Sequence, residues 1–152
     1  MDPLLQIQIR LALEDLNTGF THYLDHGRID ELVGLFTEDA LYIHGQRRSE
    51  GRAAIRALFE QRAAGGVRTC RHLSTGLRLK IDHATAARGT SVCLTFAFDG
   101  PAPVTPATPY LVADFDDTYR LCADGKWRIA SRHIRRIFTA ATNPGPVAGE
   151  RA

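Results

Sequence analysis

The sequence lacks the features that mark exported, membrane-spanning or disulfide-held proteins. It contains three cysteines, Cys70, Cys93 and Cys122, and no CxxC pair, which argues against a disulfide framework and against a thiolate zinc site. The N-terminal segment MDPLLQIQIRLALEDL has neither a basic leader nor a continuous apolar stretch, so it predicts no export signal and no membrane span. We therefore expect a cytoplasmic protein with no membrane partner.

An excess of charge of one sign is also missing. The net charge is near +2, and the basic residues are interleaved with acidic ones rather than gathered in a block, so nothing predicts a nucleic-acid partner. A composition that is 44% hydrophobic and 24% charged is typical of a globular protein. A chain of 152 residues fits one domain and is long enough to bury a core.

The N-terminal half of the chain shows helical periodicity. A first helix should run from Leu5 and end near Gly27, because its apolar residues recur at steps of three or four. A second short helix follows, and Ser49 is positioned to cap a third. The apolar residues that carry these three helices are Leu5, Ile9, Leu13, Leu16, Phe20 and Leu24, then Ile29, Leu32, Val33 and Phe36, then Ile55, Leu58 and Phe59.

The rest of the chain has the pattern of strands. A short strand is expected at 40–43, and four longer ones at about 70–82, 86–98, 110–122 and 126–138, separated by turn signals. The Pro-rich segment DGPAPVTPATPY should be an excursion rather than a strand. Helices followed by a run of strands predict an α+β fold in which helices pack on a curved antiparallel sheet.

Four motifs resemble the SnoaL-like, nuclear-transport-factor-like superfamily: YLDHGRIDELVGLFTEDALYIHG, GRAAIRALF, CRHLSTGLRL and GKWRIASRHIRRIF. The resemblance implies one SnoaL-like domain over residues 1–138, shaped as a cone with an internal pocket. The tail at 139–152 is rich in Ala, Gly and Pro and should be flexible. The resemblance also implies a homo-oligomer, a dimer or a trimer. Superfamily members include polyketide cyclases, scytalone and bile-acid dehydratases, hexachlorocyclohexane dehydrochlorinase, steroid isomerases and the non-catalytic β subunits of ring-hydroxylating dioxygenases.

The same resemblance supplies candidate site residues. An Asp at the end of the first helix and a His on the first long strand form a pair in the dehydratase and dehydrochlorinase branch, and Asp25 and His72 match them. Cys70 and Arg132 match pocket positions of the dehydrochlorinase. Phe20 stands where that enzyme has a lysine and where bile-acid dehydratases have a tyrosine.

These residues suit proton abstraction from carbon. A neutral imidazole can act as the base, and a carboxylate on its other nitrogen fixes the tautomer and stabilises the imidazolium. His72 is then the base and Asp25 its orienting partner. Elimination also needs a hydrogen-bond donor at the departing or enolate oxygen; the candidates are Arg132, Tyr42, Tyr23 and His133.

Simple periodicity conflicts with this pairing at two points. Asp25 lies off the helical stripe that ends with Phe20 and Leu24, so contact with the sheet would need the helix to unwind before Gly27. Strict alternation puts His72 on the strand face of Arg78 and Lys80, and the apolar residues Leu73, Leu77 and Leu79 on the opposite face. A bulge at 74–76 would resolve the second conflict.

The sequence thus favours a cofactor-independent lyase or isomerase, resembling the dehydratases, that acts on a small, largely apolar cyclic or aromatic substrate. The alternative is a non-catalytic ligand-binding protein or a partner subunit resembling dioxygenase β subunits. His22 and His26 are four apart on one helix, but no matching ligand cluster accompanies them, so no metal and no cofactor are expected.

Overall fold

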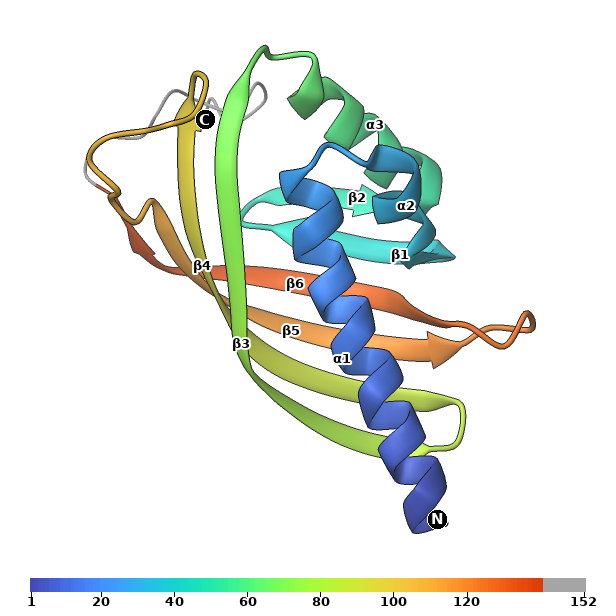
Figure 1. Ribbon diagram of the computed structural model, residues 1–152. Helices are drawn as coiled ribbons and strands as arrows, with labels where there is room; N and C mark the ends of the chain where they lie inside the picture. Colours follow the sequence, from blue (N-terminus) through green and yellow to red (C-terminus); the bar gives the residue numbers. More distant parts are fainter. Residues whose placement is uncertain (141–152) are drawn as a thin grey trace.

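The computed structural model describes residues 1–140. It contains three helices and six strands (Figure 1): α1 (Pro3–Asp25), α2 (Ile29–Gly34), β1 (Phe36–His44), β2 (Arg47–Glu50), α3 (Arg52–Ala63), β3 (Arg68–His83), β4 (Ala86–Asp99), β5 (Leu111–Leu121) and β6 (Trp127–Thr139). Within this part of the chain, no helix is both long and apolar enough to cross a membrane. Apart from Thr139 and Ala140, the tail expected at 139–152 lies outside the described residues.

The six strands form one curved, unclosed sheet in the order β2-β1-β6-β5-β4-β3. Helix α1 lies across the sheet, and α2 and α3 lie at the end where β1 and β2 pair (Figure 1). This arrangement confirms the predicted α+β cone. One pairing departs from the expected antiparallel pattern, because β1 runs parallel to β6. The chain reaches β6 from β1 only after α3 and three long strands, so a tight antiparallel connection between the two is not required.

Two local predictions between α2 and α3 were wrong. Phe36 begins β1 instead of ending the second helix, because the chain joins β6 at this point and the Ile129 amide donates to the Leu35 carbonyl at 2.8 Å. Ser49 lies in β2 opposite Tyr42 and does not cap α3. The N-cap is Gly51, whose φ of 82° suits glycine.

Helix α1 begins with Asp2 as its N-cap, whose side chain accepts from the Leu4 amide. Its buried face is wider than the predicted apolar stripe, because it also contains Asn17 and Thr21. Asp25 continues the row of Asn17 and Thr21 at four-residue steps and is the last helical residue. The expected unwinding before Gly27 is therefore wrong: a regular helix already turns Asp25 toward the sheet.

The predicted irregularity in β3 is confirmed. The register with β4 shifts between Thr75 and Arg78, which leaves one extra residue in β3, and Gly76 has a φ of 65°. Such a bulge exchanges the two faces of a strand. The more buried positions are accordingly Cys70 and His72 before the bulge, and Leu77, Leu79 and Ile81 after it.

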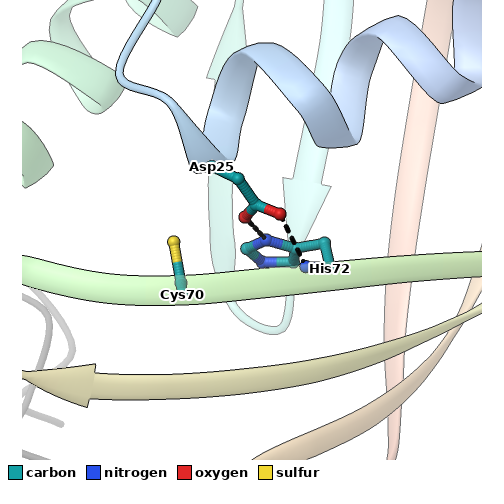
Figure 2. A group of neighbouring side chains, drawn as sticks. All are labelled: Asp25, Cys70 and His72. Carbon is teal, nitrogen blue, oxygen red and sulfur yellow. Dashed lines mark hydrogen bonds and ion pairs between the residues drawn. The ribbon is translucent and has the colours of Figure 1, made fainter. Parts of the chain in front are cut away.

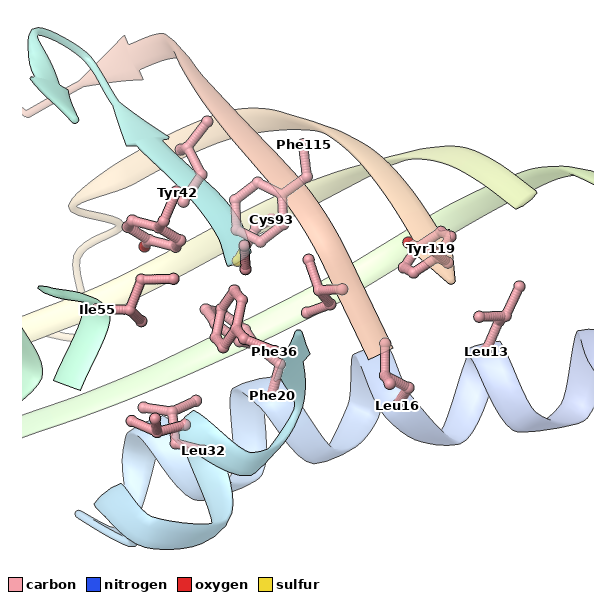
Figure 3. Close-up of a cluster of buried hydrophobic side chains, with 14 of the residues drawn as sticks. Leu13, Leu16, Phe20, Leu32, Phe36, Tyr42, Ile55, Cys93, Phe115 and Tyr119 are labelled. Carbon is pink, nitrogen blue, oxygen red and sulfur yellow. The ribbon is translucent and has the colours of Figure 1, made fainter. Parts of the chain in front are cut away.

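Aromatic rings fill the middle of the core (Figure 3). Phe20 of α1 lies edge to face with three other rings, at centroid distances of 6.1 to 6.5 Å. These rings belong to Phe36, Phe59 and Phe115, all of them buried. These rings therefore occupy the centre of the hydrophobic core.

Candidate active site

Asp25 and His72 meet where the C-terminal end of α1 passes over β3 (Figure 2). The Nδ1 atom of His72 lies 2.6 Å from Oδ1 of Asp25, and the backbone N–H of His72 donates to Oδ2 at 2.8 Å. The two side chains are only 9% and 5% exposed. Both carboxylate oxygens thus bind a single residue, which fixes the imidazole ring relative to its own backbone. We refer to these two residues as the dyad.

The sheet topology explains why a helix can reach this backbone group. β3 is an edge strand, so alternate N–H groups point away from β4 and need a partner from elsewhere. Asp25 supplies that partner at His72. The contact therefore satisfies an edge-strand amide while it orients the imidazole.

The environment keeps the Asp25 carboxylate ionised. Burial raises its pKa, but the hydrogen bonds from the His72 ring and backbone more than offset burial, so that the pKa of Asp25 is lowered. An ionised carboxylate can only accept hydrogen bonds. Neutral His72 therefore carries its proton on Nδ1 and leaves the Nε2 lone pair available as a base.

Cys70 lies two residues before His72 on the same face of β3 (Figure 2). Burial raises the pKa of its thiol, and the Asp25 charge raises it further, against the opposing charge of Arg62. Possible ligand atoms of Asp25, Cys70 and His72 lie within 4.8 Å of one another. However, Asp25 and His72 bind each other through these atoms, and Cys70 favours the thiol form, whereas zinc binds thiolate. The donor set fits a hydrogen-bonded dyad better than a metal site.

Two hollows adjoin the dyad. The helix-side hollow, about 210 Å³, is bordered by Asp25, Cys70, Tyr23 and the start of α2. The strand-side hollow, about 60 Å³, is bordered by His72, Tyr42 and residues of β4 and β5. Phe59 and Arg62 line both hollows, so α3 forms the wall between them.

Tyr23 and Tyr42 lie where substrate-binding residues were expected, one in each hollow. The Tyr42 ring packs edge to face on Phe36 and Phe59. Burial raises the pKa of Tyr42, although the nearby Arg132 charge opposes this, so the phenol keeps its proton. Within residues 1–140 no hydrogen-bond partner of its hydroxyl is recorded, which leaves a donor at the strand-side hollow.

Arg132 and Phe20 do not line either hollow. Arg132 is 1% exposed and donates to both oxygens of Asp117, at 2.9 and 2.7 Å, and to Asn17 at 2.6 Å. Its guanidinium also lies over the Phe20 and Phe115 rings. Both side chains are thus packed in the core, and their expected contact with substrate stays a prediction.

His133 does not belong to the site either. It follows Arg132 on β6 and is exposed, since neighbouring strand residues point to opposite faces. The structure therefore brings together Asp25, His72, Cys70, Tyr23 and Tyr42, and leaves Phe20, Arg132 and His133 elsewhere.

Sequence reasoning missed the two arginines that border the strand-side hollow, Arg47 and Arg62. Arg62 follows Phe59 by three positions and Ile55 by seven, so helical periodicity already put a charge on the buried face of α3. Arg47 pairs with His44 in the β1–β2 hairpin and shares a face with Tyr42. Only the pairing register reveals the second position.

A larger hollow of about 540 Å³ lies on the other side of the sheet. Thr69, Arg71, Phe96 and Phe98 form part of its wall together with the segment before β5. Thr69 and Arg71 alternate with Cys70 and His72 along β3 and point away from the dyad. Cys70 also lines this hollow. Neither dyad residue borders this hollow, so we do not assign the chemistry to it.

Comparisons with known proteins agree with this fold. A family model described as a SnoaL-like domain matches residues 6–133. The chain belongs to this SnoaL-like family. A comparison with curated proteins found no significant match.

Several solved structures have the same fold at low sequence identity. A protein named as a candidate scytalone dehydratase from Novosphingobium aromaticivorans has a TM-score of 0.78 at 22% identity, over 97% of each chain. LinA has a TM-score of 0.77 at 23% identity, over 96% of this chain and 99% of its own. ActVI-ORFA from Streptomyces coelicolor has a TM-score of 0.73 at 22% identity, over 84% of this chain and 97% of its own. At such identities the likeness shows the fold alone.

Proposed function

We propose that this SnoaL-like protein is a cofactor-independent lyase or isomerase in which His72 removes a carbon-bound proton from a small, largely apolar cyclic substrate. The observation that carries the proposal is the double contact between His72 and the Asp25 carboxylate. It holds the imidazole in the tautomer whose Nε2 can accept a proton, and the carboxylate stabilises the imidazolium that results. The dehydratase name of one structural neighbour agrees with this reaction class.

The second requirement is a donor for the oxygen on which negative charge develops. Tyr42 suits this role, because its protonated hydroxyl borders the same hollow as His72. Cys70 and Tyr23 contribute to the walls of the neighbouring hollow. Arg132 acts instead at a distance, by holding the strands and α1 together.

A non-catalytic binding role is the alternative, as a ligand-binding protein or as a partner subunit. The observation that favours it is the filled interior: Phe20, Phe36, Phe59 and Phe115 occupy the centre of the cone, and the hollow beside His72 measures only about 60 Å³. In that case a ligand would bind near the dyad without losing a proton.

Hydrogen-deuterium exchange separates the two functions without knowledge of the natural substrate. The probe is 2-tetralone, an aromatic cyclic ketone with exchangeable protons next to its carbonyl, followed by proton NMR in D₂O. We expect the protein to accelerate exchange and His72→Gln to abolish the acceleration. The matched control is His133→Gln, which changes an exposed His on the opposite side of the sheet and should exchange at the wild-type rate.

The outcome that refutes catalysis is equally specific. Exchange in His72→Gln at the wild-type rate would remove the dyad from the mechanism. If 2-tetralone shifts the amide resonance of His72 and exchange is not accelerated, the non-catalytic role is favoured.

We also propose that the chain forms a homo-oligomer through the outer face of its sheet. An apolar row crosses four strands there, because Leu73, Leu94, Val112 and Phe138 are successive partners in the pairing register. Leu73 and Phe138 are 51% and 68% exposed. Contiguous apolar surface of this kind is typical of an interface between subunits.

A further inference from the structure

Arginines in the described part of the chain usually have a hydrogen-bond or ion-pair partner. Eleven of them contact acidic side chains. Arg71 donates to the Cys70 carbonyl, and Arg136 donates to His44. For Arg47, Arg62 and Arg78, no such partner is recorded within residues 1–140. Arg78 is exposed on β3, whereas Arg47 and Arg62 are half-buried and line the strand-side hollow.

The two arginines line this hollow from different elements. Arg47 begins β2 on the face of Tyr42, and Arg62 lies in the last turn of α3. A basic residue in the last turn also suits the helix dipole. The dipole does not explain why Arg47 lines the same hollow. The presence of both arginines there therefore needs another explanation.

The charges around the dyad do not balance. Asp25 is the only carboxylate among the residues that line the two hollows, while Arg47 and Arg62 supply two positive charges. Arg68 lines the helix-side hollow too, but Asp99 pairs with it. Tyr42 and Cys70 stay neutral because burial raises the pKa of each. A partly buried positive excess is costly unless a ligand neutralises it.

We propose that the ligand of this site carries a carboxylate, which Arg47 and Arg62 bind while its apolar body lies against Phe59 and Leu111. A planar carboxylate matches the guanidinium fork, which can donate two parallel hydrogen bonds. The walls between the charges are apolar, since Leu58, Phe59 and Leu111 line the same hollow. The inference rests on the proposed function for the reaction at His72, and it adds the substrate class: an apolar ring system with an acidic group.

The test compares two probes of the same shape and different charge. 2-Naphthoate and 2-naphthalenemethanol are titrated into the 15N-labelled protein, and amide shifts of Tyr42 and His72 give the dissociation constants. We expect 2-naphthoate to bind at least about tenfold more tightly, since a hydrogen-bonded ion pair contributes that much or more. Higher salt should reduce the difference.

Variants locate the effect. Arg47→Gln and Arg62→Gln should each weaken 2-naphthoate binding about tenfold or more, and Arg62→Lys should retain part of the affinity. Arg78→Gln is the control, because it removes an unpaired arginine away from the hollows and should bind as the wild type does. The amide spectrum reports whether each variant is folded. Equal affinity for the two probes, or wild-type binding by both Gln variants, would overturn the proposal.

The outcome separates this inference from the proposed function. If the protein exchanges 2-tetralone but binds the two naphthalene probes equally, the carboxylate site is wrong and the catalytic function stands. If 2-naphthoate binds through the two arginines and no ketone exchange occurs, the catalytic function is wrong and the carboxylate site stands.

Discussion

Asp25→Asn is the most informative single substitution. It keeps the shape of the side chain and replaces one oxygen, which accepts a hydrogen bond, with an N–H₂ group, which donates one. The fixed backbone N–H of His72 requires the Asn oxygen in the position of Oδ2. The Asn amide then points its N–H₂ at Nδ1, which must become an acceptor. We therefore expect His72 to move its proton to Nε2, the atom proposed as the base.

The expected loss of stability follows from the two hydrogen bonds of the dyad. Bonds to an ionised group contribute about 1.5–3 kcal/mol each, and neutral ones about 0.5–1.5 kcal/mol. Exchanging two of the first kind for two of the second costs about 2–3 kcal/mol. In a chain of this length, that lowers the melting temperature by roughly 4–12 °C. Asp30→Asn is the control, because its ion pair with Arg56 is exposed and contributes under about 1 kcal/mol.

The pH dependence has a defined direction. Because the folded state lowers the pKa of Asp25 below its ordinary 3.8, its carboxylate stabilises the fold at every pH above about 4. That stabilisation is lost as the pH falls further, through the lowered pKa of the folded state. The difference in unfolding free energy between wild type and Asp25→Asn should thus be present at neutral pH and shrink below about pH 4.

Long-range proton-nitrogen NMR of the His72 ring measures the tautomer directly. Wild type should carry the proton on Nδ1 and Asp25→Asn on Nε2, and 2-tetralone exchange should fall on the order of 10⁴-fold, the scale of the same change in a serine-protease triad. An identical tautomer in both proteins, or undiminished exchange in the variant, would refute the reasoning.

Three further substitutions test the frame around the site. Asp117→Asn leaves Arg132 buried with a weakened partner and should lower the free energy of unfolding, measured in urea, by about 3–5 kcal/mol. Asp114→Asn is the control, because its arginine partner is exposed, and should lower it by under about 1 kcal/mol. Equal losses in the two variants would contradict the burial argument. Gly76→Val forces a branched side chain to a φ of 65° and should cost about 1–3 kcal/mol, whereas an unchanged stability would mean that the bulge is not fixed. Leu73→Glu should shift the sedimenting mass from a multiple of 16.8 kDa toward the monomer, and a monomeric wild type would remove the oligomer.

Local patterns predicted much of the fold. The apolar spacing of α1 and the alternation of the long strands gave boundaries within a few residues of those observed for β3 to β6. The bulge was predictable because His72 and Leu79 could not otherwise share the inner face. The wrong assignments of Phe36 and Ser49 lie where the chain changes from helix to strand and back, and there the pairing of β1 with β6 decides the conformation.

The site was harder to predict because it depends on pairs that are distant in the sequence. Arg132 was expected at the pocket, yet the cross-strand pairing places Asp117 opposite it. Asp117 lies between Phe115 and Tyr119 on a buried face, so alternation marked it as a buried charge that needs a partner. Arg62 is likewise a charged residue on the buried face of α3. A charge at an apolar position thus indicates either a hidden ion pair or a ligand site, and only the three-dimensional contacts distinguish the two.

Polar side chains attach α1 to the sheet at two positions, Asn17 and Asp25. Asn17 accepts from Arg132 and donates to Tyr119 at 3.0 Å, and Tyr119 in turn donates to Asp117. Asp25 lies eight residues farther along, about 12 Å at the rise of an α-helix, and binds the edge strand β3. Helix α1 is therefore fixed at two points on one face. The Arg132 network has opposite charges that balance inside the core, so it can anchor the helix without a ligand, whereas the dyad and the unpaired Arg47 and Arg62 border open space. Anchoring and the proposed chemistry thus involve different residues of the same helix and sheet.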